Sequence, residues 1–112
     1  MSDEKEIVWV GSSYKDLLGF SEEARQDAGY QLHRVQNGLE PEDWKPFQTV
    51  GSGVKEIRLN DDGNAFRVMY IAKFADRIYV LHSFKKKTQK TSMKDITISK
   101  VRYKAIIKEE KS

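Results

Sequence analysis

The chain has 112 residues, enough for a single domain with its own hydrophobic core, and it contains no cysteine, which excludes disulfides and thiolate chemistry. No apolar run approaches the roughly 20 residues of a membrane helix, and the acidic residues 1–6 do not resemble a secretory signal. We therefore expect one domain over residues 1–112, in a cytoplasmic protein without membrane contact.

Charge is distributed unevenly along the chain, although the net charge is only +3. Residues 1–50 carry 5 Lys and Arg against 10 Asp and Glu, a net of −5. Residues 51–112 carry 15 against 7, a net of +8. A basic half of this kind is either a solvated surface or a surface for a polyanion such as nucleic acid.

The N-terminal half predicts a strand followed by two helices. Residues 7–10 are apolar and end at a glycine, and a capping box at Ser13 then predicts a short helix that stops at Gly19. Ser21 caps a longer helix, which Asn37 and Gly38 terminate. The apolar positions of this longer helix lie on one face: Ala24, Ala28, Leu32 and Val35.

The C-terminal half predicts three strands and a helix, after an irregular segment over residues 39–53. Residues 54–59, 65–71 and 77–84 have strand composition and short connections, which predicts an antiparallel meander. A capping box at Ser92 starts a final helix. Its expected inward residues are Met93, Ile98, Val101, Ala105 and Ile106. The order β-α-α-β-β-β-α predicts an α+β fold, with an antiparallel sheet packed against helices.

The turn between the first two strands of the meander sets the pairing of their residues. Asp62-Gly63 is a type I′ signal, and with this turn Arg58 lies opposite Arg67 in mid-sheet. Like charges opposite each other destabilise a sheet unless something negative lies between them. Glu56 on the same face could neutralise them in an inert surface cluster. Alternatively, the two guanidinium groups form a seat for a phosphate.

A basic cluster follows the last strand and contains Lys85, Lys86, Lys87 and Lys90. Neighbouring positive charges disfavour the charged form of a lysine, so Lys86 or Lys87 could serve as a general base; simple phosphate contact is the alternative for each. His82 on the strand is either a hydrogen-bonded structural residue or part of an RNA surface. No histidine pair or closely spaced carboxylate set on the basic side predicts a metal site.

Three segments together resemble the RelE/HigB toxin superfamily, and within it the phage-derived HigB-like branch. They are Gly53-Val-Lys-Glu-Ile-Arg-Leu, Phe66-Arg-Val-Met-Tyr70 and Leu81-His-Ser-Phe-Lys-Lys-Lys-Thr-Gln-Lys-Thr91. The third segment is the most specific. The resemblance extends from Trp9 to the final helix, and the family's element order matches the one expected above.

The resemblance implies a toxin of a type II toxin–antitoxin module that inhibits translation as a ribosome-dependent mRNA endoribonuclease. Its partners would be a cognate helix-turn-helix antitoxin, mRNA and the ribosome, with no metal or other cofactor. Arg67 matches the family's arginine at the scissile phosphate, and Arg58 occupies the position of a basic residue on the preceding strand. The expected catalytic residues are Arg58, Arg67, Lys86 and Lys87, and the expected RNA-binding residues are His82, Lys85, Lys90 and Lys94.

The chain departs from this family at one catalytic position. RelE has a catalytic tyrosine after the basic cluster, whereas this chain has Ser92-Met-Lys-Asp95 there and no tyrosine before Tyr103. The resemblance therefore supports a toxin more firmly than a ribonuclease. Two alternatives stay open: a toxin of the same fold that binds a protein target such as gyrase, and a non-catalytic nucleic-acid-binding module.

Overall fold

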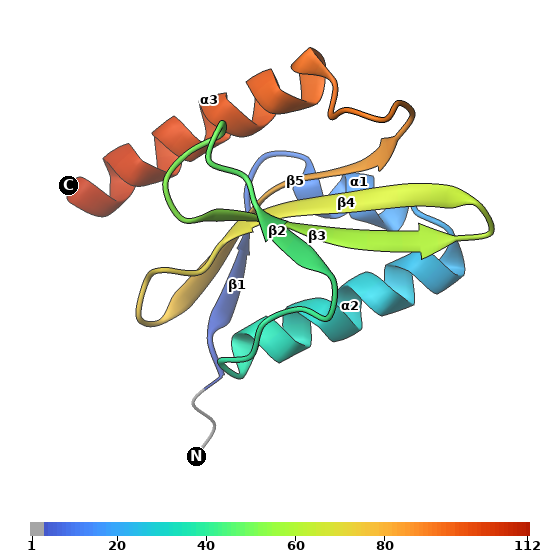
Figure 1. Ribbon diagram of the computed structural model, residues 1–112. Coiled ribbons are helices and arrows are strands. Elements are labelled where there is room, and N and C mark those ends of the chain that lie inside the picture. The colour runs from blue at the N-terminus through green and yellow to red at the C-terminus, as the bar shows by residue number, and fades with distance from the viewer. Residues whose placement is uncertain (1–3) are drawn as a thin grey trace.

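Five strands form a single sheet in the order β1-β5-β4-β3-β2 in the computed structural model, which describes residues 4–112 (Figure 1). The elements in chain order are β1 (Glu6–Trp9), α1 (Ser13–Leu18), α2 (Glu22–Gln36), β2 (Trp44–Pro46), β3 (Val54–Asp61), β4 (Asn64–Ile71), β5 (Arg77–Lys86) and α3 (Met93–Lys111). The predicted α+β fold with helices packed on a sheet is confirmed.

Two features of the sheet differ from the prediction. The segment expected to be irregular contains β2, which pairs antiparallel with β3. In addition, β1 pairs parallel with β5, so the sheet is mixed rather than wholly antiparallel. Local sequence patterns could not predict these two pairings, because each joins segments that are separated in sequence. In addition, β2 has only three residues, too few to show the alternation of apolar and polar residues that is typical of a strand.

The helices cover both faces of the sheet. One core lies between the sheet and the helices α1 and α2, and it includes Leu17, Leu32, Ile57 and Val68. A second core lies on the opposite face under α3 and includes Met69, Leu81 and Ile106. Figure 1 shows α3 above the sheet and α2 below it. The sheet is therefore the middle layer of three, and its β3 and β4 strands carry alternate residues into each core.

The expected inward face of α3 is confirmed only in part, since Ile106 is buried and Ile98 is half-buried. Met93 and Val101 are 71% and 62% exposed, and Ala105 is exposed as well. The buried residues of this helix are Ser99 and Ile106. The side of α3 that faces the sheet includes polar residues whose side chains bond the backbone. Ser99 is one of them, and its Oγ donates a hydrogen bond to the Asp95 carbonyl at 2.8 Å. A pattern of apolar residues could not identify the polar part of this face.

Serine residues precede all three helices. The Oγ of Ser21 accepts a hydrogen bond from the amide of Ala24 at 3.2 Å, and the Oγ of Ser92 accepts one from the amide of Asp95 at 3.1 Å. The first helix is preceded by Ser12 rather than by the expected Ser13, which is buried. No helix within residues 4–112 combines the length and apolar character needed to cross a membrane.

The predicted register of the β3–β4 hairpin is confirmed. Asp62 and Gly63 have φ angles of 49° and 78°, the left-handed conformation that a type I′ turn requires at both positions. Arg58 pairs with Arg67 as a result. Because the two arginines share a face with Met69, which belongs to the core under α3, they lie on the α3 side of the sheet.

Candidate nucleic-acid interface

A buried carboxylate accompanies the arginine pair. Glu56 is 0% exposed and Arg67 is 5% exposed, whereas Arg58 is half-buried. Arg67 Nε lies 3.8 Å from Glu56 Oε1, and Arg67 Nη1 donates to the carbonyl of Phe66 at 2.9 Å. The three residues therefore do not form the solvated surface cluster considered from the sequence. Glu56 offsets the repulsion between the arginines beneath the surface.

Lys86 joins this cluster from the end of β5. Burial lowers the pKa of Lys86, and the positive charge of Arg67 lowers the pKa further. Glu56 opposes this shift, while Lys45 and Arg58 add to it. A lysine with a lowered pKa releases its proton more readily, which is the direction of shift that favours a general base.

Arg67 experiences the same competition between burial and charge. Burial lowers the pKa of its guanidinium, Glu56 raises the pKa, and Arg58 lowers it again. Asp43 raises the pKa as well. Asp43 and Lys45 come from the segment that we expected to be irregular, so only the pairing of β2 with β3 reveals that they border this site.

A β-bulge in β5 determines which side chains accompany the arginines. Met69 pairs with His82 but Tyr70 pairs with Val80, so Leu81 is an extra residue in the strand. The bulge brings His82 and Phe84 to the α3 face, where Phe84 pairs with Arg67. Strict alternation from Val80 would have placed both side chains on the opposite face.

His82 connects β5 to the start of α3. Its ring is 5% exposed and stacks on Phe84, with 4.9 Å between the ring centroids. Its Nε2 lies 2.7 Å from Asp95 Oδ1. From the sequence, His82 was either a hydrogen-bonded structural residue or part of an RNA surface, and this contact corresponds to the first interpretation. Its predicted contact with RNA would require this ring to leave Asp95.

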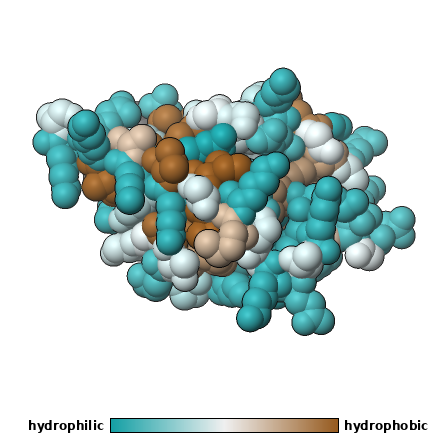
Figure 2. Space-filling model, turned by 90° about the horizontal axis from the view of Figure 1, so that it is seen from above, coloured by the Kyte–Doolittle hydropathy of each residue, from teal (hydrophilic) through white to brown (hydrophobic). Residues whose placement is uncertain are grey.

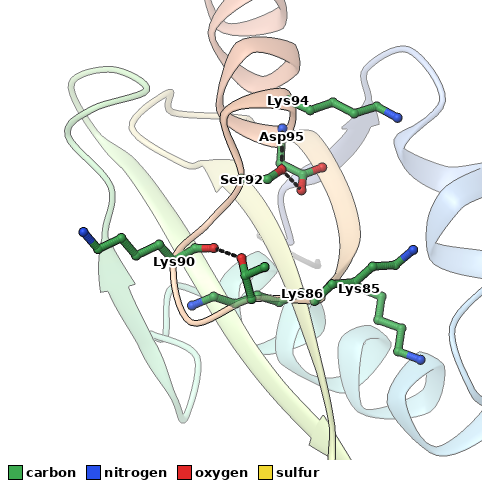
Figure 3. Close-up of a pocket in the computed structure, with 8 residues that line it drawn as sticks. Lys85, Lys86, Lys90, Ser92, Lys94 and Asp95 are labelled. Atoms are coloured by element: carbon green, nitrogen blue, oxygen red, sulfur yellow. Dashed lines mark hydrogen bonds between the residues drawn. The ribbon is translucent and has the colours of Figure 1, made fainter.

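The lysines at the end of β5, in the β5–α3 connection and at the start of α3 do not all point in one direction. Lys85, Lys87, Lys90 and Lys94 are exposed, and together with Lys86 they line a pocket that also contains Asp95. In Figure 3 the side chains of Lys86 and Lys90 extend to one side of the connection, whereas those of Lys85 and Lys94 extend to the other. Only Lys86 joins the arginines, and the rest form an exposed basic rim.

Tyr103 does not replace the missing catalytic tyrosine at this cluster. Its hydroxyl donates to the carbonyl of Ser52 at 3.1 Å, in the loop that precedes β3. Arg58 lies toward the other end of β3. No group of three or more metal-ligating side chains occurs among the residues that the structure describes. The charged functional groups of the arginine cluster and its rim are therefore two guanidinium groups, lysine ammonium groups and a buried carboxylate.

Comparison with known protein families gives a match over most of the chain. The model of a family described as "Phage derived protein Gp49-like (DUF891)" matches residues 15–104, a segment that contains the arginine pair and the whole basic rim. No curated protein matches the chain significantly. The match covers most of the chain and supports the coarse expectation of a phage-derived, toxin-like protein. The chain belongs to the phage-derived Gp49-like family, a toxin-like family of toxin–antitoxin systems.

Proposed function

We propose that this protein is a ribosome-dependent mRNA endoribonuclease that inhibits translation and is neutralised by a cognate helix-turn-helix antitoxin. The observation that carries the proposal is the convergence of Arg58, Arg67 and Lys86 on one face of the sheet. A lysine-rich rim borders this cluster. Such a rim suits the phosphate backbone of mRNA and ribosomal RNA.

The residues support cleavage by transesterification. Lys86, in its neutral form, would take the proton of a ribose 2′-hydroxyl. The 2′-oxygen then forms a bond to phosphorus, and the bond from phosphorus to the 5′-oxygen breaks, which leaves a 2′,3′-cyclic phosphate. Arg58 and Arg67 would stabilise the negative charge that develops on the phosphoryl oxygens. The departing 5′-oxygen would take a proton from solvent, and Lys86 would release the proton that it accepted to solvent.

The first experiment is a cell-free translation reaction with a defined mRNA, in which primer extension maps new 3′ ends. Wild-type protein and Arg67→Ala are compared with and without ribosomes. We expect cleavage only with ribosomes, and a loss of about 100-fold or more in the variant because it lacks a transition-state cation. Arg25→Ala on α2 is the matched control, since Arg25 bonds only the Leu18 carbonyl.

A further variant separates chemistry from folding, because Arg67 is buried. Lys86→Met removes the proposed base from a half-buried position and should abolish cleavage while thermal unfolding stays near that of the wild type. Intact mRNA in the presence of folded wild-type protein that still arrests growth would reject the ribonuclease proposal.

One observation favours a second candidate, a toxin that acts by binding a protein target. Arg67 is 5% exposed, and its Nη1 donates to the carbonyls of Phe66 and Leu59, so the side chain has a structural role without any substrate. Growth arrest without cleavage, combined with co-purification of a cellular protein, would support this candidate.

A further inference from the structure

A groove beside the arginine cluster combines apolar walls with a cationic rim. It lies between the end of β2 and the β5–α3 connection. Its apolar lining consists of Phe47, Met93 and Ile96, and its charged lining consists of Lys45, Lys86 and Lys90. The remaining lining residues are uncharged and polar: Thr88, Gln89, Thr91 and Ser92. No acidic side chain is among those that line the groove.

The apolar walls of this groove are accessible to a ligand. Met93 is 71% exposed at the first position of α3, and Ile96 and Phe47 are half-buried. Phe47 packs against the core under α3, so its ring is held in place. Figure 2 looks down on this side of the molecule and shows apolar side chains lying between hydrophilic ones.

Lys86 connects the groove to the arginine pair. It lines the groove, and it is close enough to Arg67 and Arg58 for their charges to act on its ammonium group. A strand of RNA whose phosphate lies at the arginines would therefore place a neighbouring nucleotide at the groove.

We propose that the groove holds one unstacked nucleobase of single-stranded RNA, flanked by phosphates on Lys45 and Lys90. The proposal rests on the proposed function and deepens it by naming the form of the substrate. Aromatic and thioether side chains provide good contacts for the face of a base. The purely cationic rim favours a polyanion over an apolar peptide segment. A base inside a duplex cannot reach such walls, so the substrate must be unpaired there.

The test measures binding apart from cleavage. Fluorescence anisotropy compares a fluorescein-labelled 2′-O-methyl hexanucleotide, which cannot be cut, with oligonucleotides that carry a single abasic site at successive positions. We expect wild-type protein to lose about tenfold in affinity when the abasic site falls at one particular position. Met93→Ala should reduce this difference to about threefold or less. Val101→Ala, also on α3 and 62% exposed but outside the groove, should keep it.

Several outcomes would overturn the base site. Equal affinity for intact and abasic oligonucleotides is one, and equal behaviour of the Met93→Ala and Val101→Ala proteins is another. If mRNA cleavage still depends on Arg67 in those cases, the proposed function stands without the base site. If the oligonucleotides fail to bind but an acidic, tryptophan-containing peptide binds in a manner that depends on Met93, the groove is a peptide site instead.

Discussion

At the scale of single residues, Glu56 connects the catalytic candidates to the basic rim. Its Oε1 lies 3.8 Å from Arg67 Nε, and its Oε2 accepts a hydrogen bond from Thr91 Oγ1 at 3.3 Å. Thr91 belongs to the connection between β5 and α3. One fully buried carboxylate thus neutralises an arginine on β4 and holds the segment that carries the lysines.

Neutralising this carboxylate should destabilise the fold. Glu56→Gln leaves the buried Arg67 without its counter-charge, and breaking a buried ion pair in this way lowers the free energy of unfolding by about 3 kcal/mol. Urea denaturation followed by circular dichroism measures the change. Glu109→Gln is the control, because Glu109 is exposed near the end of α3 and should change stability by less than about 0.5 kcal/mol. Equal midpoints for the two variants would contradict the buried pairing.

At the scale of elements, the β3–β4 hairpin is the device that aligns the two arginines. Its turn uses left-handed φ angles at both Asp62 and Gly63. A different turn would change the register, and a shift by one residue would move a side chain to the other face of the sheet. The conformation of these two residues therefore determines the composition of the site.

Two glycines with equally open surroundings test this dependence. A Cβ atom at Gly63 or at Gly29 would meet no heavy atom within 4 Å, so neither alanine creates a clash. Gly63→Ala should nevertheless destabilise the protein by about 1–2 kcal/mol, because φ at this position is 78°. Gly29→Ala, in the interior of α2, should stabilise it by about 1 kcal/mol. Thermal unfolding of both variants shows whether each substitution raises or lowers the stability of the protein. A stabilising Gly63→Ala would be inconsistent with the type I′ turn.

At the scale of the whole molecule, the two charged halves of the chain cover different faces. The acidic half supplies α1 and α2 on one side of the sheet, and the basic half supplies β5, the lysine-rich connection and α3. This arrangement orients a polyanion toward the α3 side during approach.

RNA affinity should depend strongly on salt. For single-stranded RNA, the logarithm of the binding constant falls with the logarithm of salt concentration, with a slope of about −0.7 for each neutralised phosphate. Lys90→Gln should make the slope less steep by about 0.7, because Lys90 lines both the pocket and the groove. Lys108→Gln, exposed near the other end of α3, should leave the slope unchanged. A salt-independent affinity would argue against contact with the phosphate backbone.

The sequence by itself determined the features that follow from local rules. Alternation along β3 and β4, together with the Asp62-Gly63 turn, predicted that Arg58 and Arg67 lie opposite each other, and the structure confirms this pairing. The caps of α2 and α3 at Ser21 and Ser92 were likewise predicted, because a cap is recognised by residues within one turn of the helix start.

Only the tertiary structure decided the features that depend on distant contacts. The pairing of β2 with β3 brought Lys45 to the site, and the bulge at Leu81 turned His82 and Phe84 toward the arginines. Arg67 is buried because it packs beneath other elements, which its own neighbours in sequence do not reveal. The exposed Met93 became part of a groove for the same reason. Burial and bulges arise from the packing of whole elements, so no short window of sequence specifies them.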